Sequence, residues 1–75
     1  MIKAYILVAT SIGKEKAVAE KLQKLKEVEF ADILYGNWDI ILRVNVGSLE
    51  ELDTFLTERI RKSKNIKNTS TLIAS

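Results

Sequence analysis

The sequence contains no cysteine, no histidine and no proline, and only three glycines. Without cysteine the chain cannot form disulfides, and without cysteine or histidine it lacks the commonest zinc ligands. The same absences remove the usual general base and the thiol nucleophile of enzymes. The glycines are too scattered for a Walker loop or a dinucleotide fingerprint. The acidic residues form neither a converging acid/base pair nor a calcium loop, so the sequence predicts a non-enzymatic protein without metal or cofactor.

A length of 75 residues predicts one domain, covering residues 1–75. A chain this short buries only about 60% of the surface that its unfolded form exposes, so it is marginally stable alone. Small folds usually gain further stability from disulfides, a metal or self-association. Because the side chains for the first two are missing, we expect this chain to associate with itself.

Twelve basic and ten acidic residues give a net charge of +2. The stretch from Arg59 to Lys67 contains five basic residues and no acid. Such a run is typical of a helix end, where cations complement the helix dipole; a phosphate or nucleic-acid patch is the alternative. The apolar start of the chain has no signal-peptide cleavage pattern and is too short to span a bilayer. We therefore expect a cytoplasmic protein without a membrane partner.

The period of the apolar residues changes regularly along the chain. Residues 14–26 and the stretch that follows Ser48 have the spacing of helices. Residues 10–13 (TSIG) precede the first helix as a turn with a capping hydroxyl. Four stretches alternate with the period of a strand: residues 2–9, 28–35, 38–46 and 66–74.

Two short motifs define the middle of the chain. Gly36-Asn37 is a hairpin signal, because both residues tolerate a positive φ. Residues 48–51 (SLEE) form a capping box, in which Ser48 covers one free amide and Glu51 reaches back to another. Apolar residues then continue at helical spacing up to Ile60, which predicts the second helix.

The order β-α-β-β-α-β predicts an α+β fold, a ferredoxin-like sandwich of a four-stranded antiparallel sheet with two helices on one face. The hairpin places the third strand beside the second, most simply between the first and the second. The other sheet face is too apolar to stay in water, so we interpret it as a dimer interface in which two sheets pack face to face. The residues predicted for this interface are Tyr5, Leu7, Ile33, Tyr35, Ile41 and Ile73.

A four-stranded sheet also raises the alternative of RNA recognition. RNA-recognition modules stack bases on exposed aromatic residues of their central strands, next to a basic-Gly-aromatic signature. The third strand here, residues 40–44 (IILRV), contains no aromatic pair. This argues against RNA as a partner.

Three segments stand out in combination: residues 35–44 (YGNWDIILRV), 48–52 (SLEEL) and 69–71 (TST). They resemble the effector-binding (RAM) domain of the Lrp/AsnC family of transcription regulators, which has a Gly-x-x-Asp hairpin, an apolar strand with Arg and Val, and a threonine-rich last strand. The likeness covers essentially the whole chain in order and spacing. Full-length members begin with a DNA-binding helix-turn-helix, whereas this sequence begins at its first strand. It looks like a stand-alone form, for which we expect no direct DNA binding.

The resemblance implies sheet-to-sheet dimers that assemble into an octamer or a similar ring of about four dimers. It also implies an amino acid bound between dimers, and a full-length Lrp/AsnC regulator as a candidate partner. Through such assembly the chain would modulate transcription or amino-acid metabolism. Gly36 and Asp39 match the family's hairpin, and Thr69 and Thr71 match its last strand. With the residues that lie between them, the predicted ligand-binding residues are Gly36, Asn37, Trp38, Asp39, Thr69, Ser70 and Thr71.

These residues suit the ligand, but each also has a structural alternative. Asp39 would accept from the ammonium group, while the amides of Gly36 and Asn37 and the threonine hydroxyls would donate to the carboxylate. Alternatively, Gly36 serves only the turn, Asp39 caps it, and the threonines of residues 69–71 are simply good strand formers. Two other functions stay open: a purely structural assembly module without ligand, and a small dimeric α+β barrel enzyme. The enzyme needs a closed polar pocket between sheets, and the apolar sheet face argues against one.

Overall fold

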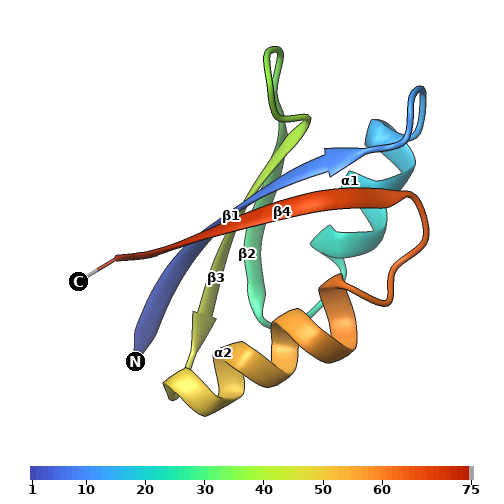
Figure 1. Ribbon diagram of the computed structural model, residues 1–75. Helices are drawn as coiled ribbons and strands as arrows, with labels where there is room; N and C mark the ends of the chain where they lie inside the picture. Colours follow the sequence, from blue (N-terminus) through green and yellow to red (C-terminus); the bar gives the residue numbers. More distant parts are fainter. Residues whose placement is uncertain (75) are drawn as a thin grey trace.

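Strands and helices follow one another in the predicted order β-α-β-β-α-β (Figure 1). The computed structural model describes residues 1–74. The second helix continues without a break into a π-helical turn, η1. The elements are β1 (Ile2–Thr10), α1 (Glu15–Gln23), β2 (Val28–Ile33), β3 (Ile40–Val46), α2 (Leu49–Phe55), η1 (Leu56–Ile60) and β4 (Ile66–Ala74). The predicted fold class is confirmed.

The four strands form one antiparallel sheet in the order β2-β3-β1-β4. β1 is a central strand: Ile6 lies opposite Leu42 on β3 and opposite Thr71 on β4. β3 therefore lies between β2 and β1, as the hairpin predicted. The two helices cover one face of this sheet (Figure 1). β2 and β4 are left as its edges.

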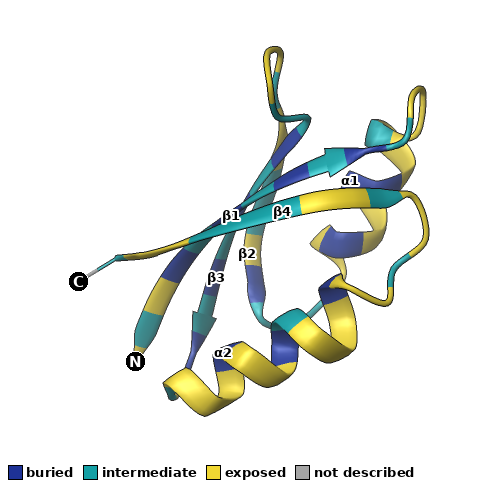
Figure 2. Ribbon diagram, in the orientation of Figure 1, coloured by how far each residue is buried: buried dark blue, intermediate teal, exposed yellow. Residues whose placement is uncertain are grey.

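The core lies between the sheet and the helices, where alternate residues of the two central strands are buried (Figure 2). Each buried isoleucine, leucine or valine side chain among them contributes about 1.5–3 kcal/mol when it is removed from water. Val18 and Leu22 of α1, with Leu52 and Phe55 of α2, close the core from the other side. The fully buried strand residues are Ala4, Ile6, Val8, Ile40, Leu42 and Val44.

A bulge near the start of β2 changes which of its side chains face the helices. Val28 lies opposite Val44, but Phe30 lies opposite Arg43, so Glu29 is an extra residue in the strand. Beyond such an insertion the side chains that simple alternation assigns to one face lie on the other. Phe30 therefore lies on the face away from the helices, which we call the outer face.

Three residues predicted for the outer face lie elsewhere, because directly opposite residues of neighbouring strands share a face. Ile33 lies opposite the buried Ile40, and Ile73 lies opposite the buried Ala4, so both are on the helix side. Tyr35 lies beyond the end of β2 in the hairpin loop and is 100% exposed. These three placements were wrong.

The hairpin loop is longer than the predicted two-residue turn. The Leu34 amide donates to the Asp39 carbonyl at 2.8 Å, which leaves residues 35–38 as the loop between them. Gly36 has a φ of 146°, a conformation that strains any residue with a side chain. The positive φ expected at Gly36 is confirmed, whereas Asn37 does not adopt one.

α2 begins with the predicted capping box. The Ser48 hydroxyl accepts from the Glu51 amide at 3.1 Å. The Glu51 carboxylate reaches back and accepts at 3.0 Å from the amide of Gly47, one residue before the position that such boxes usually cover. Two amides at the helix start are thereby satisfied.

α1 begins without the predicted capping hydroxyl. Its N-cap is Lys14, which makes no side-chain cap hydrogen bond, and the helix ends at Gln23 rather than at residue 26. The predicted turn is present, since the Lys14 amide donates to the Ser11 carbonyl at 3.0 Å. Only the capping hydroxyl was wrong: the Thr10 hydroxyl is engaged elsewhere, 3.3 Å from the Asp39 carboxylate.

Gln23, at the end of α1, covers part of the free edge of β2. Its Oε1 accepts from the Ala31 amide at 2.7 Å, and its Nε2 donates to the Glu29 carbonyl at 3.5 Å. A further strand adding to this edge would need the same two backbone groups. The Gln23 side chain therefore occupies the place of a neighbouring strand.

We expect Gln23→Ala to lower the free energy of unfolding by about 1 kcal/mol, since it removes one good hydrogen bond to the edge. The uncovered edge also raises concentration-dependent association, which light scattering over a dilution series measures. Lys24→Ala is the matched control, because Lys24 is the next residue and its side chain is exposed. Identical unfolding and scattering for the two variants would show that Gln23 does not protect the edge.

Candidate functional site

Asp39 ties the β2–β3 hairpin to the end of β1. Its Oδ2 accepts from the Thr10 amide at 2.8 Å and from the Thr10 hydroxyl at 3.3 Å. Its own amide donates to the Val8 carbonyl at 2.9 Å. Thr10 is only 6% exposed, so its amide depends on a protein acceptor. We call this contact the Thr10–Asp39 latch; it holds the hairpin base in one position relative to β1.

A cavity of about 380 Å³ opens between the hairpin and the turn from β1 to α1. Gly36 and Asp39 line it, whereas Asn37 and Trp38 do not. The hydrogen bonds within residues 1–74 engage only Oδ2 of the Asp39 carboxylate, so its Oδ1 is available to a ligand. The lining residues are Thr10, Ile12, Gly13, Glu15, Ile33, Leu34, Tyr35, Gly36 and Asp39. We call this the hairpin cavity.

Thr69, Ser70 and Thr71 lie on β4, which β1 separates from the hairpin. Val8 on β1 shows the separation, because Asp39 binds its carbonyl from one side and Thr69 lies opposite it on the other. Two strand spacings amount to about 10 Å. Thr69 and Thr71 lie on the helix side and Ser70 on the outer face. None of these three residues lines the hairpin cavity of its own protomer.

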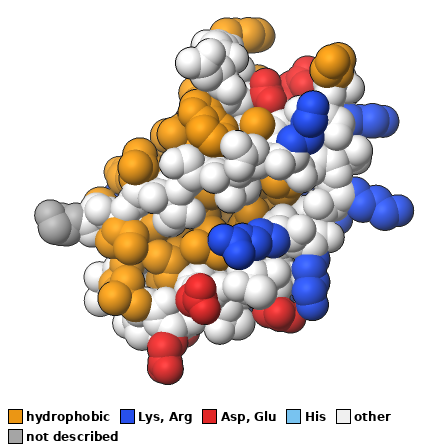
Figure 3. Space-filling model, viewed as in Figure 1, with side chains coloured by type: hydrophobic (Ala, Val, Ile, Leu, Met, Phe, Trp, Pro, Cys, Tyr) orange, Lys and Arg blue, Asp and Glu red, His pale blue; other side chains and the backbone are white. Residues whose placement is uncertain are grey.

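Apolar side chains from all four strands lie on the outer face. Tyr5, Leu7 and Ile41 are there, as the alternation of their strands predicts, and the register adds Phe30 and Leu72. Leu72 is 54% exposed, the others half-buried. In Figure 3 hydrophobic side chains gather on the left, whereas lysine and arginine lie mainly on the right, on the α1 side. The role of this face as an interface stays a prediction.

Arg43 is the cation at the centre of the outer face. Its Nε lies 2.9 Å from Oε1 of Glu29, in an ion pair without an aligned hydrogen bond. Its guanidinium lies 5.8 Å from the centre of the Tyr5 ring, within the range of a cation–π contact. Both partners of the ion pair are partly exposed, so it contributes at most about 1 kcal/mol. A covering protein surface would remove water from this pair.

The described residues 1–74 include no helix long and apolar enough to cross a membrane. Over the same residues, no three His, Cys, Asp or Glu side chains are grouped closely enough to hold a metal ion. The chemistry available at the hairpin is therefore that of a carboxylate, backbone amides and hydroxyl groups.

The element order, the sheet order and the two helices on one face define a ferredoxin-like domain. The family model described as "Lrp/AsnC ligand binding domain" matches residues 3–75. The chain therefore belongs to the Lrp/AsnC family.

Curated relatives support this assignment. An uncharacterised HTH-type transcriptional regulator of Pyrococcus furiosus is 43% identical over 72 residues, which cover 96% of this chain and 49% of the relative. A similar regulator of Pyrococcus horikoshii is 40% identical, with coverages of 96% and 46%. The chain thus spans about half the length of the curated relatives that it matches. Family and relatives are transcription regulators, which confirms the prediction that the chain is not an enzyme.

Solved structures share the fold. The crystal structure of FFRP-DM1 superposes with a TM-score of 0.97 at 47% identity, and the match covers 100% of both chains. E. coli AsnC has a TM-score of 0.91 at 27% identity, over 97% of this chain and 50% of its own. A transcriptional regulator of Neisseria meningitidis, solved as an L-Met complex, has a TM-score of 0.85 at 16% identity, over 99% of this chain and 49% of its own. At that identity, the last comparison shows the common fold alone.

Proposed function

We propose that this chain is an amino-acid-responsive oligomerisation domain that modulates transcription or amino-acid metabolism through the proteins with which it assembles. The observation that carries the proposal is the hairpin cavity, which combines a fixed carboxylate with a glycine of the main chain. Membership of the Lrp/AsnC ligand-binding family supports it. The L-Met complex of the Neisseria meningitidis regulator supports an amino acid as the ligand class.

Recognition of a free amino acid requires an acceptor for its ammonium group and donors for its carboxylate. The Thr10–Asp39 latch engages Oδ2 and so orients the carboxylate of Asp39, whose Oδ1 then meets the ammonium group in a charge-assisted hydrogen bond. A side group at Gly36 would meet nothing within 4 Å, so a ligand has room to approach the main chain there. The remaining donors, from residues 69–71, come from a neighbouring copy, because β1 separates them from the hairpin of the same protomer.

Assembly is the second part of the proposal. Outer faces of two copies pack against each other, and the dimers then close into an octamer or a similar ring. The apolar outer face supports this, since monomeric proteins rarely leave such a patch in water. A chain of 75 residues without cysteine also needs the additional burial.

The proposed partners are further copies of the chain, a free amino acid and a full-length Lrp/AsnC regulator. Mixed assembly with such a regulator, or competition for its effector, would transmit the ligand signal. This needs no contact of the domain itself with DNA. Since transcription regulators act where the chromosome lies, the proposal places the chain in the cytoplasm.

A thermal-shift screen of the amino acids tests the sensing role. At a ligand concentration of 100 times Kd, binding stabilises the folded state by about 2.7 kcal/mol. For a domain of this size, each kcal/mol raises Tm by roughly 4–8 °C. We expect Asp39→Asn to abolish this shift, because it removes the negative charge that faces the ammonium group. The unliganded Tm changes little, since the amide oxygen still accepts from Thr10.

Glu20→Gln is the control, because it removes one negative charge at an exposed position of α1. It should keep the full ligand shift. If no amino acid raises Tm at millimolar concentration, the chain is not an amino-acid sensor. If Asp39→Asn keeps the shift, the ligand does not bind at the hairpin.

The Thr10–Asp39 latch also favours a second function, an assembly module that binds no small molecule. In that case Asp39 serves only to position the hairpin, and its charge has no other role. This module would show the same oligomer as the sensing domain but no thermal shift with any amino acid. The thermal-shift screen therefore separates the two functions.

A further inference from the structure

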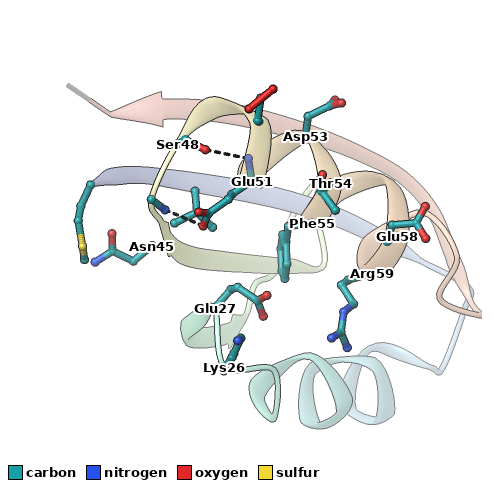
Figure 4. A pocket seen from close by; sticks show the side chains of 14 residues that line it. Lys26, Glu27, Asn45, Ser48, Glu51, Asp53, Thr54, Phe55, Glu58 and Arg59 are labelled. Carbon is teal, nitrogen blue, oxygen red and sulfur yellow. Dashed lines mark hydrogen bonds between the residues drawn. The ribbon is translucent and has the colours of Figure 1, made fainter.

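A second cavity, of about 940 Å³, lies between α2 and the segment that joins α1 to β2 (Figure 4). It is at the opposite end of β3 from the hairpin cavity, and the two cavities share no lining residue. All of its lining residues belong to a single protomer, so it requires no neighbouring copy. We call it the helix-side cavity.

Glu27 presents a buried acceptor to this cavity. Its Oε1 is shielded from solvent and has no hydrogen-bond partner within residues 1–74. A buried carboxylate oxygen without a donor is costly, and most such atoms in proteins are satisfied. The Glu27 carbonyl accepts from the Asn45 amide at 3.0 Å, which anchors its backbone to β3. In Figure 4 the Glu27 carboxylate points into the space below Phe55.

Arg59 brings a positive charge into the same space from the opposite wall (Figure 4). It belongs to η1, and the Ser63 hydroxyl donates to its carbonyl at 2.6 Å, which fixes its backbone. The ion pairs of residues 1–74 do not include Arg59, so its guanidinium donors remain open to a ligand. Glu27 and Arg59 thus face a common space without neutralising each other.

Phe55 forms an apolar wall between these two charges (Figure 4). It is only 3% exposed, and its ring is held in the core. Two other acids that line the cavity are already engaged: Glu51 accepts from the helix start, and Glu58 pairs with Lys62 at 3.3 Å. Of the acids that line the cavity, Glu27 is the one with a solvent-shielded oxygen that lacks a hydrogen-bond donor within residues 1–74.

We propose that the helix-side cavity is a ligand site for a small zwitterion whose amino and carboxylate groups are separated by a short apolar chain. The ammonium group binds Glu27, the carboxylate binds Arg59, and the apolar chain lies against Phe55. Both contacts are charge-assisted hydrogen bonds, the strongest kind available at such a site. The proposal does not rest on the hairpin cavity or on oligomer formation.

Amide NMR of the whole chain, titrated with unbranched ω-amino acids from β-alanine to 6-aminohexanoate, tests the site. At least one of these compounds should shift the amide signals of Glu27, Phe55 and Arg59 and leave those of the hairpin unchanged. Glu27→Gln and Arg59→Gln should each weaken its binding by about tenfold or more, as the loss of a charge-assisted contact predicts. Asp39→Asn should bind it unchanged, which keeps this test separate from the hairpin.

Butylamine and butanoate are the matched ligand controls, since each carries only one of the two charges. Each should bind at least tenfold more weakly than the best ω-amino acid. The proposal is overturned if no ω-amino acid shifts these signals at tens of millimolar, or if Glu27→Gln binds as well as the unaltered chain. Sensitivity of binding to Asp39→Asn alone would assign the ligand to the hairpin, which refutes this site but not the proposed function.

Discussion

Ile41→Glu is expected to convert the assembled protein into monomers. Ile41 lies at the middle of the outer face, opposite Leu7 on β1 and opposite Asp32 on β2. If two outer faces pack together, the substitution buries a carboxylate without a partner, at a cost of about 3–5 kcal/mol. This corresponds to a dimer weakened by about two to four orders of magnitude. Sedimentation velocity over a dilution series measures the change.

Ala17→Glu is the control for this experiment. Ala17 is exposed on α1, on the opposite side of the sheet, so the same new charge is added without entering the proposed interface. This variant should keep the size of the unaltered protein. An Ile41→Glu protein that is folded and still assembled would rule out packing of the outer faces.

Asp39→Ala is expected to destabilise the fold by about 1–3 kcal/mol, since it leaves the buried Thr10 amide without an acceptor. For a domain of this size, Tm should fall by roughly 4–8 °C for each kcal/mol. Urea unfolding, followed by the fluorescence of Trp38, measures the loss. The free energy of unfolding should fall while the slope with denaturant stays constant.

Two variants divide the latch into its parts. Thr10→Val removes the hydroxyl contact, which at 3.3 Å is the weaker bond, and should cost less than Asp39→Ala. Asp39→Asn keeps an acceptor for the Thr10 amide and should remain close to the unaltered protein. Equal stability of Asp39→Ala and Asp39→Asn would mean that the 2.8 Å contact to the amide contributes nothing.

The central strands could be predicted from the sequence because both of their neighbours are strands of the same sheet and one of their faces is buried. Under these conditions the period of two fixes which side chain faces the core, as it does for Ile6 and Leu42. The capping box at Ser48 was predictable for a related reason, since its hydrogen bonds join residues three and four positions apart. Hydrogen bonds between residues a few positions apart, and the short period of buried side chains along a strand, can be recognised in a sequence.

The edge strands were harder, because an inserted residue changes the alternation without changing the composition. The extra residue Glu29 moved Phe30 to the outer face and Ile33 away from it. No local signal marks such a bulge in the sequence. Leu72 was missed although β4 alternates regularly at this point. Thr71 lies opposite the buried Ile6, so its neighbour Leu72 lies on the outer face, opposite Tyr5.

The candidate site shows the same limit. The hairpin could be located from Gly36 and Asp39, but the latch joins Asp39 to a residue 29 positions earlier. The helix-side cavity depends on η1, a π-helical turn that helical periodicity does not reveal. The parts of the site that sequence analysis missed therefore depend on contacts between segments that are far apart in the sequence.

Gln23 has a consequence for how many copies a continuous sheet can contain. Since its amide already bonds the Glu29 carbonyl and the Ala31 amide, part of the β2 edge is occupied, and β4 is the other edge of the sheet. Two copies joined β4 to β4 would form a sheet with β2 at both ends, each end partly covered by a Gln23 side chain. Growth beyond two copies along the hydrogen-bonding direction would have to displace these side chains, whereas a sheet with two open edges can extend into a fibre.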